Sequence, residues 1–301
     1  MDREQVRGVI PPIITPVDKD EKVDENGLRR VIEHVIVGGV HGILVLGSNG
    51  EFFGLDYEEQ RRAVSITVNQ VNGRVPVYMG IGAITTKECI KLARMAEELN
   101  ADAITVLPPM FLGPSEEELY RHFVSIAEST SLPVLLYNNP DRVGINLSAN
   151  LVDRLASVPG ILGVKDSSGD MTLTAEYIRR TRDRDFKVLA GRDTMILGSL
   201  VYGAVGCVAS TANIAPELVV DIYEKYMAGD LKQSLESQFN LSPLRIAASL
   251  GSFPVVTKDA ANLIGLEVGE PILPNTCCSD QNKQKLKEIL VSMGILKSQE
   301  V

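Results

Sequence analysis

Two apolar segments of the sequence end in side chains that could act on a carbonyl compound. Residues 134–137 and 161–165 are short apolar runs, and each is followed by Pro, Gly, Asp or Asn residues of the kind that end a strand. Tyr137 and Lys165 are therefore expected at the ends of two buried strands. If these strands are neighbours in a parallel sheet, the phenol and the amine project into the same space.

The Lys165 amine is a candidate nucleophile. In water only about one lysine in a few thousand is neutral at pH 7. Burial at the end of an apolar strand penalises the ammonium form, so it favours the neutral amine that attack on a ketone requires. The alternative interpretation is that Lys165 extends to solvent and that Tyr137 is a core residue with a hydrated hydroxyl group.

The two segments belong to a regular alternation of strand-like runs and amphipathic helices, which predicts an α/β protein. Strands are expected at residues 8–16, 43–46, 75–79, 103–107, 134–137, 161–165, 186–190 and 205–209. Helices are expected at residues 24–37, 85–99, 149–156, 173–181 and 194–202, and from residues 56 and 115 onward. Capping boxes are expected at three helix starts, at Asp56 with Glu59, Thr85 with Glu88, and Ser115 with Glu118.

Eight strand–helix units within 227 residues predict a closed TIM (β/α)8 barrel with additional C-terminal helices. We expect residues 1–227 to form the barrel and residues 228–301 to form a C-terminal helical extension, packed on the barrel or at a subunit interface. Further helices are expected at residues 230–250, 257–263 and 281–293. An open doubly wound sheet would show the same alternation, but its GxGxxG motif after the first strand is missing.

The composition argues against several classes of partner. The 301 residues carry a formal net charge of −9, and no Lys/Arg block stands out, so neither nucleic acid nor an anionic membrane surface is an expected partner. No apolar run has the length of a membrane span, and the N-terminus lacks the apolar stretch of a signal peptide. The four cysteines show no metal-ligand spacing. We expect a cytoplasmic protein with free thiols and no metal.

Other polar residues also follow predicted strands, at the carboxyl ends where TIM barrels carry their active sites. After residues 43–46, the hydroxyl group of Ser48 and two successive backbone N–H groups could form a nest for a carboxylate, or simply an ordinary turn. After residues 134–137, Arg142 offers a bidentate fork for a second carboxylate, or is a surface arginine in a Pro-Asp turn. Three histidines have no acid–base partner in view and are interpreted as structural: His34, His41 and His122.

Three motifs together resemble the dihydrodipicolinate synthase/N-acetylneuraminate lyase family of class I, Schiff-base-forming, pyruvate-dependent aldolases. They are Gly-Ser-Asn-Gly-Glu at residues 47–51, Leu-Tyr-Asn-x-Pro at residues 136–140 and Gly-Val-Lys-Asp at residues 163–166, and the similarity runs from Gly8 through the C-terminal helices. The resemblance implies that Lys165 condenses with the ketone of pyruvate or a related 2-oxo acid, giving an imine that stabilises the neighbouring carbanion as an enamine. It implies proton transfer by Tyr137, and no metal or organic cofactor.

The resemblance also implies the remaining site residues and the partners. The catalytic residues would be Lys165, Tyr137 and Ser48. The substrate-binding residues would be Ser48, Asn49, Arg142, Ser167, Asp193 and Val208. The partners would be a 2-oxo acid such as pyruvate, an aldehyde, and further copies of the chain in a dimer or tetramer.

Substrate choice is expected to depend on residues that depart from the synthase pattern of this family. Dihydrodipicolinate synthases usually carry Thr-Thr where Ser48-Asn49 stands. They also relay protons through a second tyrosine, from a neighbouring subunit, where Met110-Phe111 stands, and Phe111 has no hydroxyl group to continue that relay. Lys-Asp-Ser at residues 165–167 and Leu-Ala-Gly at residues 189–191 are, with the Ser-Asn pair, similar to the 4-hydroxy-2-oxoglutarate aldolase branch.

These departures predict a carbon–carbon lyase that cleaves or condenses a short carboxylated 2-oxo acid of the 4-hydroxy-2-oxoglutarate or 2-keto-3-deoxy acid type. The first alternative is dihydrodipicolinate synthase itself, which condenses pyruvate with aspartate semialdehyde, because Arg142 stands where those synthases bind the carboxylate of the aldehyde. N-acetylneuraminate lyase is disfavoured because Arg192-Asp193 differs from its acidic pair. The second alternative is a barrel that binds a 2-oxo acid without turnover.

Overall fold

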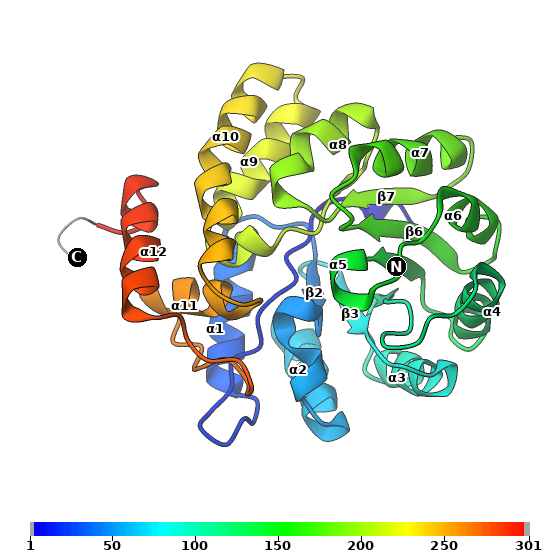
Figure 1. Cartoon of the computed structure of the whole chain (residues 1–301), viewed down its shortest axis with the longest axis horizontal. Coiled ribbons are helices and arrows are strands. Elements are labelled where there is room, and N and C mark those ends of the chain that lie inside the picture. Colours follow the sequence, from blue (N-terminus) through cyan, green and yellow to red (C-terminus); the bar gives the residue numbers. More distant parts are fainter. Residues whose placement is uncertain (1–2, 298–301) are drawn as a thin grey trace.

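A computed structural model describes residues 3–297 of the chain (Figure 1). Within these residues, eight parallel strands form one sheet in the order β1-β8-β7-β6-β5-β4-β3-β2. The strands are β1 (Gly8–Val9), β2 (Ile43–Val45), β3 (Val77–Ile81), β4 (Ala103–Val106), β5 (Val134–Asn138), β6 (Ile161–Asp166), β7 (Lys187–Ala190) and β8 (Gly206–Cys207). Because β1 pairs with β8, the first and last strands meet, and the predicted TIM (β/α)8 barrel is confirmed.

The barrel closes between β1 and β2 through a segment that contains two prolines. Pro12 and Leu44 form a parallel bridge, and the Leu44 N–H donates to the Pro11 carbonyl oxygen at 2.9 Å. Proline has no N–H group, so the backbone of Pro11 and Pro12 can accept hydrogen bonds from β2 but cannot donate any. Regular strand pairing in the predicted first strand, residues 8–16, is therefore limited to its first two residues, and the remainder pairs through isolated bonds.

Helices surround the sheet and connect its strands, as Figure 1 shows. They are α1 (Glu25–Val37), α2 (Tyr57–Val71), α3 (Thr86–Glu98), α4 (Glu116–Ala127), α5 (Pro140–Val143), α6 (Ala149–Leu155), α7 (Met171–Thr181), α8 (Ile196–Tyr202), α9 (Pro216–Met227), α10 (Leu231–Ala247), α11 (Val255–Leu263) and α12 (Asp280–Ser292). At α4, Ser115 and Glu118 form the full predicted capping box. At α2 only half of the predicted capping box forms. Asp56 accepts from the Glu59 N–H at 2.9 Å, but the Glu59 carboxylate accepts from the Val23 N–H at 2.8 Å and not from the backbone of Asp56, so the full box predicted there was wrong.

The interior of the barrel is filled by side chains from every strand or the residue beside it. One buried apolar cluster consists of Val6, Ile10, Leu44, Tyr78, Ala103, Leu135, Leu162, Leu189 and Val208. A larger cluster lies between the strands and the surrounding helices. Because successive strand residues face opposite sides, each strand serves both clusters. A packed interior leaves a ligand room only at the barrel's ends, so the residues at the carboxyl ends of the strands decide the chemistry.

The helices after residue 227 lie on one side of the barrel. α10 packs against α8, α9 and α12, and Figure 1 shows α12 farthest out on that side. One side chain from this region reaches the loop after β2, since Lys258 Nζ of α11 lies 2.5 Å from Glu51 Oε2. The separation of residues 228–301 from the barrel stays a prediction.

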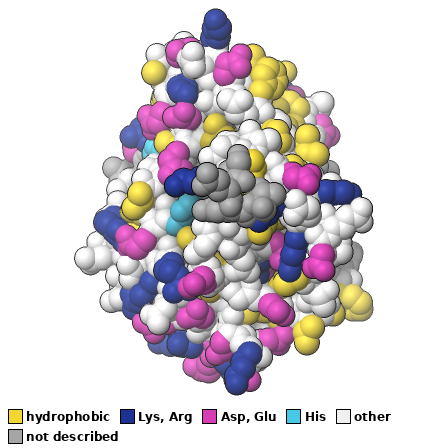
Figure 2. Space-filling model, turned by 90° about the vertical axis from the view of Figure 1, so that its left-hand side faces the viewer, with side chains coloured by type: hydrophobic (Ala, Val, Ile, Leu, Met, Phe, Trp, Pro, Cys, Tyr) yellow, Lys and Arg dark blue, Asp and Glu magenta, His cyan; other side chains and the backbone are white. Residues whose placement is uncertain are grey.

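Figure 2 shows the face of the molecule that carries the C-terminal helices, and no single type of side chain dominates it. Acidic and basic side chains are interspersed on it, with hydrophobic side chains between them. Among the helices of residues 3–297, none is both long and apolar enough to cross a bilayer.

Candidate active site

The Lys165 amine lies against the ring of Tyr137 at the carboxyl ends of β5 and β6. The two residues are paired in register across these neighbouring strands. Lys165 Nζ lies 3.9 Å from the centroid of the Tyr137 ring. Lys165 is 3% exposed and Tyr137 is 5% exposed, so the alternative in which the lysine extends to solvent was wrong. The predicted amine and phenol are thus brought together, while their catalytic roles stay predictions.

The residues that follow Tyr137 and Lys165 lie on the opposite face of the sheet and hold the adjacent loops. The Asp166 carboxylate accepts from Thr174 Oγ1 at 2.5 Å and from Asn138 Nδ2 at 3.0 Å. Asn138 Oδ1 in turn accepts from the Leu147 N–H at 2.9 Å. These bonds fix the ends of both strands, and with them the amine and the phenol.

The hydroxyl group of Tyr137 is surrounded by hydrogen-bond donors. Asn139 Nδ2 donates to Tyr137 Oη at 2.8 Å, and the side chains of Ser48 and Lys165 also bond to the hydroxyl. Burial by itself would raise the pKa of Tyr137, but the charge of Lys165 and the three hydrogen bonds outweigh burial and hold that pKa below its usual value. The phenol is therefore suited to exchange a proton closer to neutral pH than a free tyrosine would.

The turn after β2 places small polar groups next to this pair. Ser48, Asn49 and Gly50 form one 3-10 turn, in which Ser48 is 7% and Asn49 is 5% exposed. Asn49 Oδ1 is buried and has no hydrogen-bond partner among the described residues. At Gly50 a Cβ atom would lie only 3.0 Å from Thr15 Oγ1, so the tight packing of the turn favours glycine. The Ser48 hydroxyl group and the backbone N–H groups of this buried turn are donors that suit a small anion, whereas Asn49 Oδ1 is an acceptor and would need a donor from the ligand.

A small cavity of about 80 Å³ opens beside Lys165 and Tyr137. The predicted residues that line it, besides these two, are Asn49, Arg142, Ser167, Asp193 and Val208. Ser48 joins this group through its bond to the Tyr137 hydroxyl. Arg192, which the sequence places after the seventh strand, lines the cavity too, as do residues that the sequence reasoning missed, among them Asn139, Arg245 and Phe253.

Some of the predicted binding residues are already engaged within the protein. Asp193 Oδ2 accepts from the Thr211 backbone N–H at 2.8 Å and from Thr211 Oγ1 at 2.7 Å. Ser167 Oγ donates to the Gly191 carbonyl oxygen at 3.3 Å. Val208 belongs to the apolar cluster inside the barrel. These contacts shape the wall of the cavity, and binding of substrate by the three residues stays a prediction.

Three arginines line the cavity, and they differ in what they contact. Arg192 is paired with Asp141 and donates through Nε to the Ser167 carbonyl oxygen at 3.0 Å. The Arg142 guanidinium instead lies over the Phe253 ring, 4.2 Å from its centroid. Within residues 3–297, the side chains of Arg142 and Arg245 form no ion pair with a carboxylate. Their N–H groups remain available to a ligand that carries a carboxylate or phosphate.

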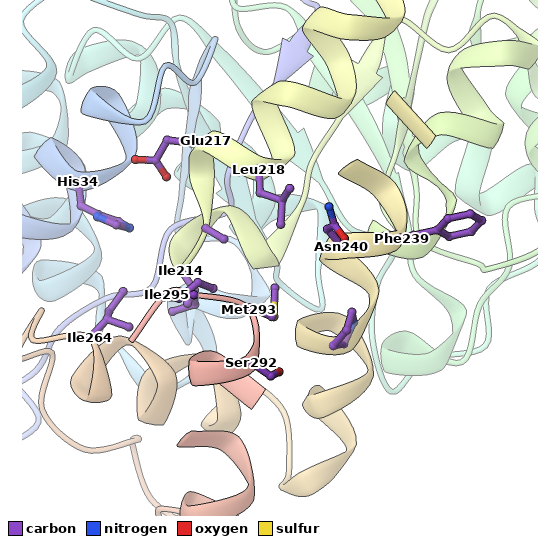
Figure 3. A pocket seen from close by; sticks show the side chains of 13 residues that line it. His34, Ile214, Glu217, Leu218, Phe239, Asn240, Ile264, Ser292, Met293 and Ile295 are labelled. Atoms are coloured by element: carbon purple, nitrogen blue, oxygen red, sulfur yellow. The ribbon is translucent and has the colours of Figure 1, made fainter. Parts of the chain in front are cut away.

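A second, larger cavity lies away from these residues. It measures about 800 Å³ and lies between α1, α9, α10 and the residues that follow α12. Figure 3 shows the side chains around it, which include His34, Glu217, Asn240, Ser292 and Met293. Among the described residues, its lining includes no lysine or cysteine, and no cluster of His, Cys, Asp and Glu in residues 3–297 could hold a metal ion. The smaller cavity, which holds the amine, is therefore the candidate active site.

Comparison with known proteins identifies the family. Residues 5–293 match the model of the Dihydrodipicolinate synthetase family. The chain belongs to this family. The 4-hydroxy-tetrahydrodipicolinate synthase of Methanopyrus kandleri is 38% identical over 294 residues, which cover 97% of this chain and 98% of the relative. The synthase of Thermodesulfovibrio yellowstonii is also 38% identical, over 97% of this chain and 99% of the relative.

Solved structures of the dihydrodipicolinate synthetase family agree with the fold. The dihydrodipicolinate synthase of Thermotoga maritima matches with a TM-score of 0.93 and 31% identity, covering 96% of this chain and 99% of that one. YagE of Escherichia coli K12, a prophage protein of the family crystallised in complex with pyruvate, matches with a TM-score of 0.94 and 31% identity, covering 97% of this chain and 99% of that one.

Membership of the dihydrodipicolinate synthetase family confirms the predicted family and the predicted class of enzyme, a carbon–carbon lyase. The predicted preference for a 4-hydroxy-2-oxoglutarate or 2-keto-3-deoxy acid is not confirmed, since the Methanopyrus kandleri and Thermodesulfovibrio yellowstonii relatives are named as synthases and favour the first alternative. The expectation that no cofactor is needed stays a prediction.

Proposed function

We propose that the chain condenses pyruvate with aspartate semialdehyde, the reaction of a 4-hydroxy-tetrahydrodipicolinate synthase. The observation that carries the proposal is the buried Lys165 amine, 3.9 Å from the Tyr137 ring centroid, in a cavity that two unpaired arginines also line. The relatives with this name support it, because they match this chain along almost its whole length. No metal or organic cofactor is required, because the lysine itself supplies the electron sink.

The first half of the proposed reaction activates pyruvate. The Ser48 hydroxyl and the backbone of the buried turn would hold the carboxylate of pyruvate, while Lys165 Nζ attacks its ketone carbon. Tyr137 would give a proton to the departing hydroxyl group, which leaves as water, and a protonated imine results. The methyl group then loses a proton to the Tyr137 phenolate left by the previous step, the imine cation accepts the electron pair that remains, and an enamine forms.

The second half joins the two substrates. The enamine carbon attacks the aldehyde, and the oxygen that develops negative charge takes a proton from Tyr137. The amino group of the second substrate then attacks the imine carbon and displaces the Lys165 amine, which closes the ring and frees the enzyme. Arg142 and Arg245 would bind the carboxylate of aspartate semialdehyde, since their guanidinium groups line the cavity and have no carboxylate partner in the described part of the chain.

A second candidate is an aldolase that acts on a short 4-hydroxy-2-oxo acid. It uses the same imine and enamine but has a different aldehyde. Phe111 favours it, because the resemblance places a proton-relay tyrosine of the synthases at Met110-Phe111, and Phe111 has no hydroxyl group. The Ser48-Asn49 pair in place of Thr-Thr favours it as well.

Two measurements on the purified protein test these proposals. Incubation with pyruvate and borohydride should add the mass of one reduced pyruvate, on Lys165, and an unmodified lysine would reject both candidates. A coupled assay with aspartate semialdehyde, run beside retro-aldol cleavage of 4-hydroxy-2-oxoglutarate, then separates them. If the chain is a synthase that lacks one relay hydroxyl, Phe111→Tyr should raise the rate with aspartate semialdehyde.

We propose in addition that the chain works as a homo-oligomer. Phe111 is 92% exposed and adopts a φ of 71°, a left-handed backbone conformation that is uncommon for a bulky residue. The neighbouring Leu112 is 47% exposed, so this loop presents an apolar surface that a second copy could cover. Sedimentation should show a dimer or larger species, and Phe111→Asp should shift it toward the monomer.

A further inference from the structure

We propose that Asn139 is a positioning residue, whose side-chain amide holds the Tyr137 hydroxyl oxygen as a proton acceptor. Asn139 Nδ2 donates to Tyr137 Oη at 2.8 Å, and this bond is buried. Asn139 is 8% exposed, so water does not compete freely for either group. The inference rests on the proposed chemistry of Lys165 and Tyr137, but it concerns a residue to which that chemistry gives no role.

Asn139 precedes a helix, but its side chain bonds to Tyr137 and does not cap that helix. Asn139 precedes α5, at the N-cap position, where an asparagine oxygen usually accepts from a backbone N–H of the first helical turn. Its side chain makes no such capping bond. Pro140 follows at the first helical position and lacks an N–H group, so one fewer donor there needs a partner. The asparagine side chain is therefore free to serve the phenol.

The chemistry of an amide decides the direction of the bond. An amide nitrogen can donate but cannot accept, so the phenol oxygen must accept from Asn139. Ser48 and Lys165 also approach this oxygen, and donors on several sides favour the phenolate form. Tyr137 is thereby kept ready to take a proton, as it must when Lys165 loses one on attacking the ketone. A hydroxyl group at residue 139 could pass a proton on, whereas the amide can only hold the oxygen in place.

Other charged groups also face this hydroxyl across the cavity. Lys165 of β6 is in direct contact with Tyr137. The further charged side chains that line the cavity are Asp141, Arg142, Arg192, Asp193 and Arg245. Asp141 is paired with Arg192, and Asp193 accepts two bonds from Thr211. The hydrogen bond of the Asn139 side chain goes to Tyr137 and not to these groups, so a shift in the titration of Tyr137 in an uncharged variant such as Asn139→Leu is assigned to the lost amide donor.

Substitutions of Asn139 that remove or keep its amide donor provide the test. Asn139→Asp keeps the shape but replaces the donor with an acceptor, and Asn139→Leu removes both. The first measurement is the rate of borohydride-trappable imine formation with pyruvate alone, as a function of pH. The second is the ultraviolet titration of tyrosinate, with each protein compared with the same protein carrying Tyr137→Phe, so that only Tyr137 is read.

We expect Asn139→Leu to raise the pKa of Tyr137 and to move the alkaline-rising limb of the rate profile to higher pH by roughly one unit, with an about tenfold lower rate at neutral pH. Asn139→Asp should raise the pKa of Tyr137 and the pH of the rising limb further, because a negative carboxylate next to the hydroxyl disfavours the phenolate. Asn139→Gln, which keeps the amide, should recover part of the rate. The matched control is Asn150→Leu, whose amide donates to Glu116 Oε1 at 2.9 Å outside the cavity, and it should behave as the wild type.

Two results would overturn the inference. One is an unchanged tyrosinate titration and rate profile in both Asn139→Leu and Asn139→Asp. The other is a loss that lies entirely in the KM for pyruvate, which would make Asn139 a binding residue instead. A wild-type protein that forms no imine with pyruvate would reject the proposed function itself, so the two failures are distinguishable.

Discussion

Lys165 and Lys258 are both almost fully buried, at 3% and 0% exposure, but they contact different groups. Lys258 Nζ lies 2.5 Å from Glu51 Oε2 and donates to the Glu270 carbonyl oxygen at 3.0 Å. Lys165 lies against an aromatic ring instead, and within residues 3–297 it forms no ion pair with a carboxylate. Lys258 thus has a carboxylate partner, whereas Lys165 has none among the described residues.

This difference distinguishes an ion-paired lysine from the lysine that we propose as the nucleophile. Burial lowers the pKa of Lys258, and the Glu51 carboxylate opposes that shift. The contact between Lys258 and Glu51 ties α11 to the loop after β2. The Lys165 amine has no such partner among residues 3–297 and lies in the cavity, where a ketone could reach it. The same contrast distinguishes Arg192, which is paired with Asp141, from the unpaired arginines of the cavity.

Replacing the unpaired lysine should have the largest effect on activity. Lys165→Met keeps most of the side-chain volume but removes the amine, so trapping of pyruvate by borohydride should disappear and turnover should fall at least about 10⁴-fold. Unfolding in urea should show no loss of stability beyond about 1 kcal/mol, because no ion pair is broken. Retention of trapping in this variant would place the nucleophile elsewhere.

Replacing the paired lysine should act on stability. Lys258→Met leaves the Glu51 carboxylate buried without its cation, and removal of one partner of a buried ion pair costs about 3–5 kcal/mol of unfolding free energy. Urea denaturation followed by circular dichroism measures this loss. Because Glu51 directly follows the turn that contains Ser48 and Asn49, imine formation with pyruvate should also slow.

The matched control removes both charges. Lys258→Met combined with Glu51→Leu leaves no buried ion, so most of the lost stability should return. A residual loss of about 1–3 kcal/mol of unfolding free energy is expected in the double variant. In the wild-type protein the Ile272 N–H donates to Glu51 Oε1 at 2.9 Å, and it would lose this acceptor. A double variant as unstable as the sum of both single variants would show that the pair itself is not what stabilises this region.

The two lysines also mark what could be predicted from the sequence. Lys165 and Tyr137 were found because each ends its own apolar run before a loop, which is a local pattern. The barrel then places β5 beside β6 in a register that pairs the two residues. The partner of Lys258 lies in a distant loop, and a helical pattern around residues 257–263 carries no information about a contact that only the folded chain creates.

The same reason explains the site residues that were missed. Asn139 lies in a stretch rich in Asn, Pro and Asp, where asparagine has several common roles, and only the position of the Tyr137 hydroxyl selects among them. Arg245 lies in the last turn of α10, where a basic residue is favoured by the helix dipole alone. Its place at the cavity depends on how α10 packs against the barrel, which no local pattern specifies.

Arg245 extends the contrast between paired and unpaired cations to the mouth of the cavity, with the smallest expected effect. Arg245→Gln removes the charge but keeps a polar side chain, and it should raise the KM for aspartate semialdehyde about tenfold, because a charge-assisted hydrogen bond is lost at a partly solvated position. The rate of imine formation with pyruvate should not change, since that carboxylate is expected at the turn of Ser48 and Asn49. The control is Arg154→Gln, because the Arg154 guanidinium pairs with Glu117 on the surface at 2.8 Å. This variant should change neither the KM for aspartate semialdehyde nor the rate of imine formation. If Arg245→Gln instead weakened the binding of pyruvate and of aspartate semialdehyde equally, Arg245 would contribute only a general positive potential. An arginine without a carboxylate partner would then no longer indicate where the carboxylate of aspartate semialdehyde binds.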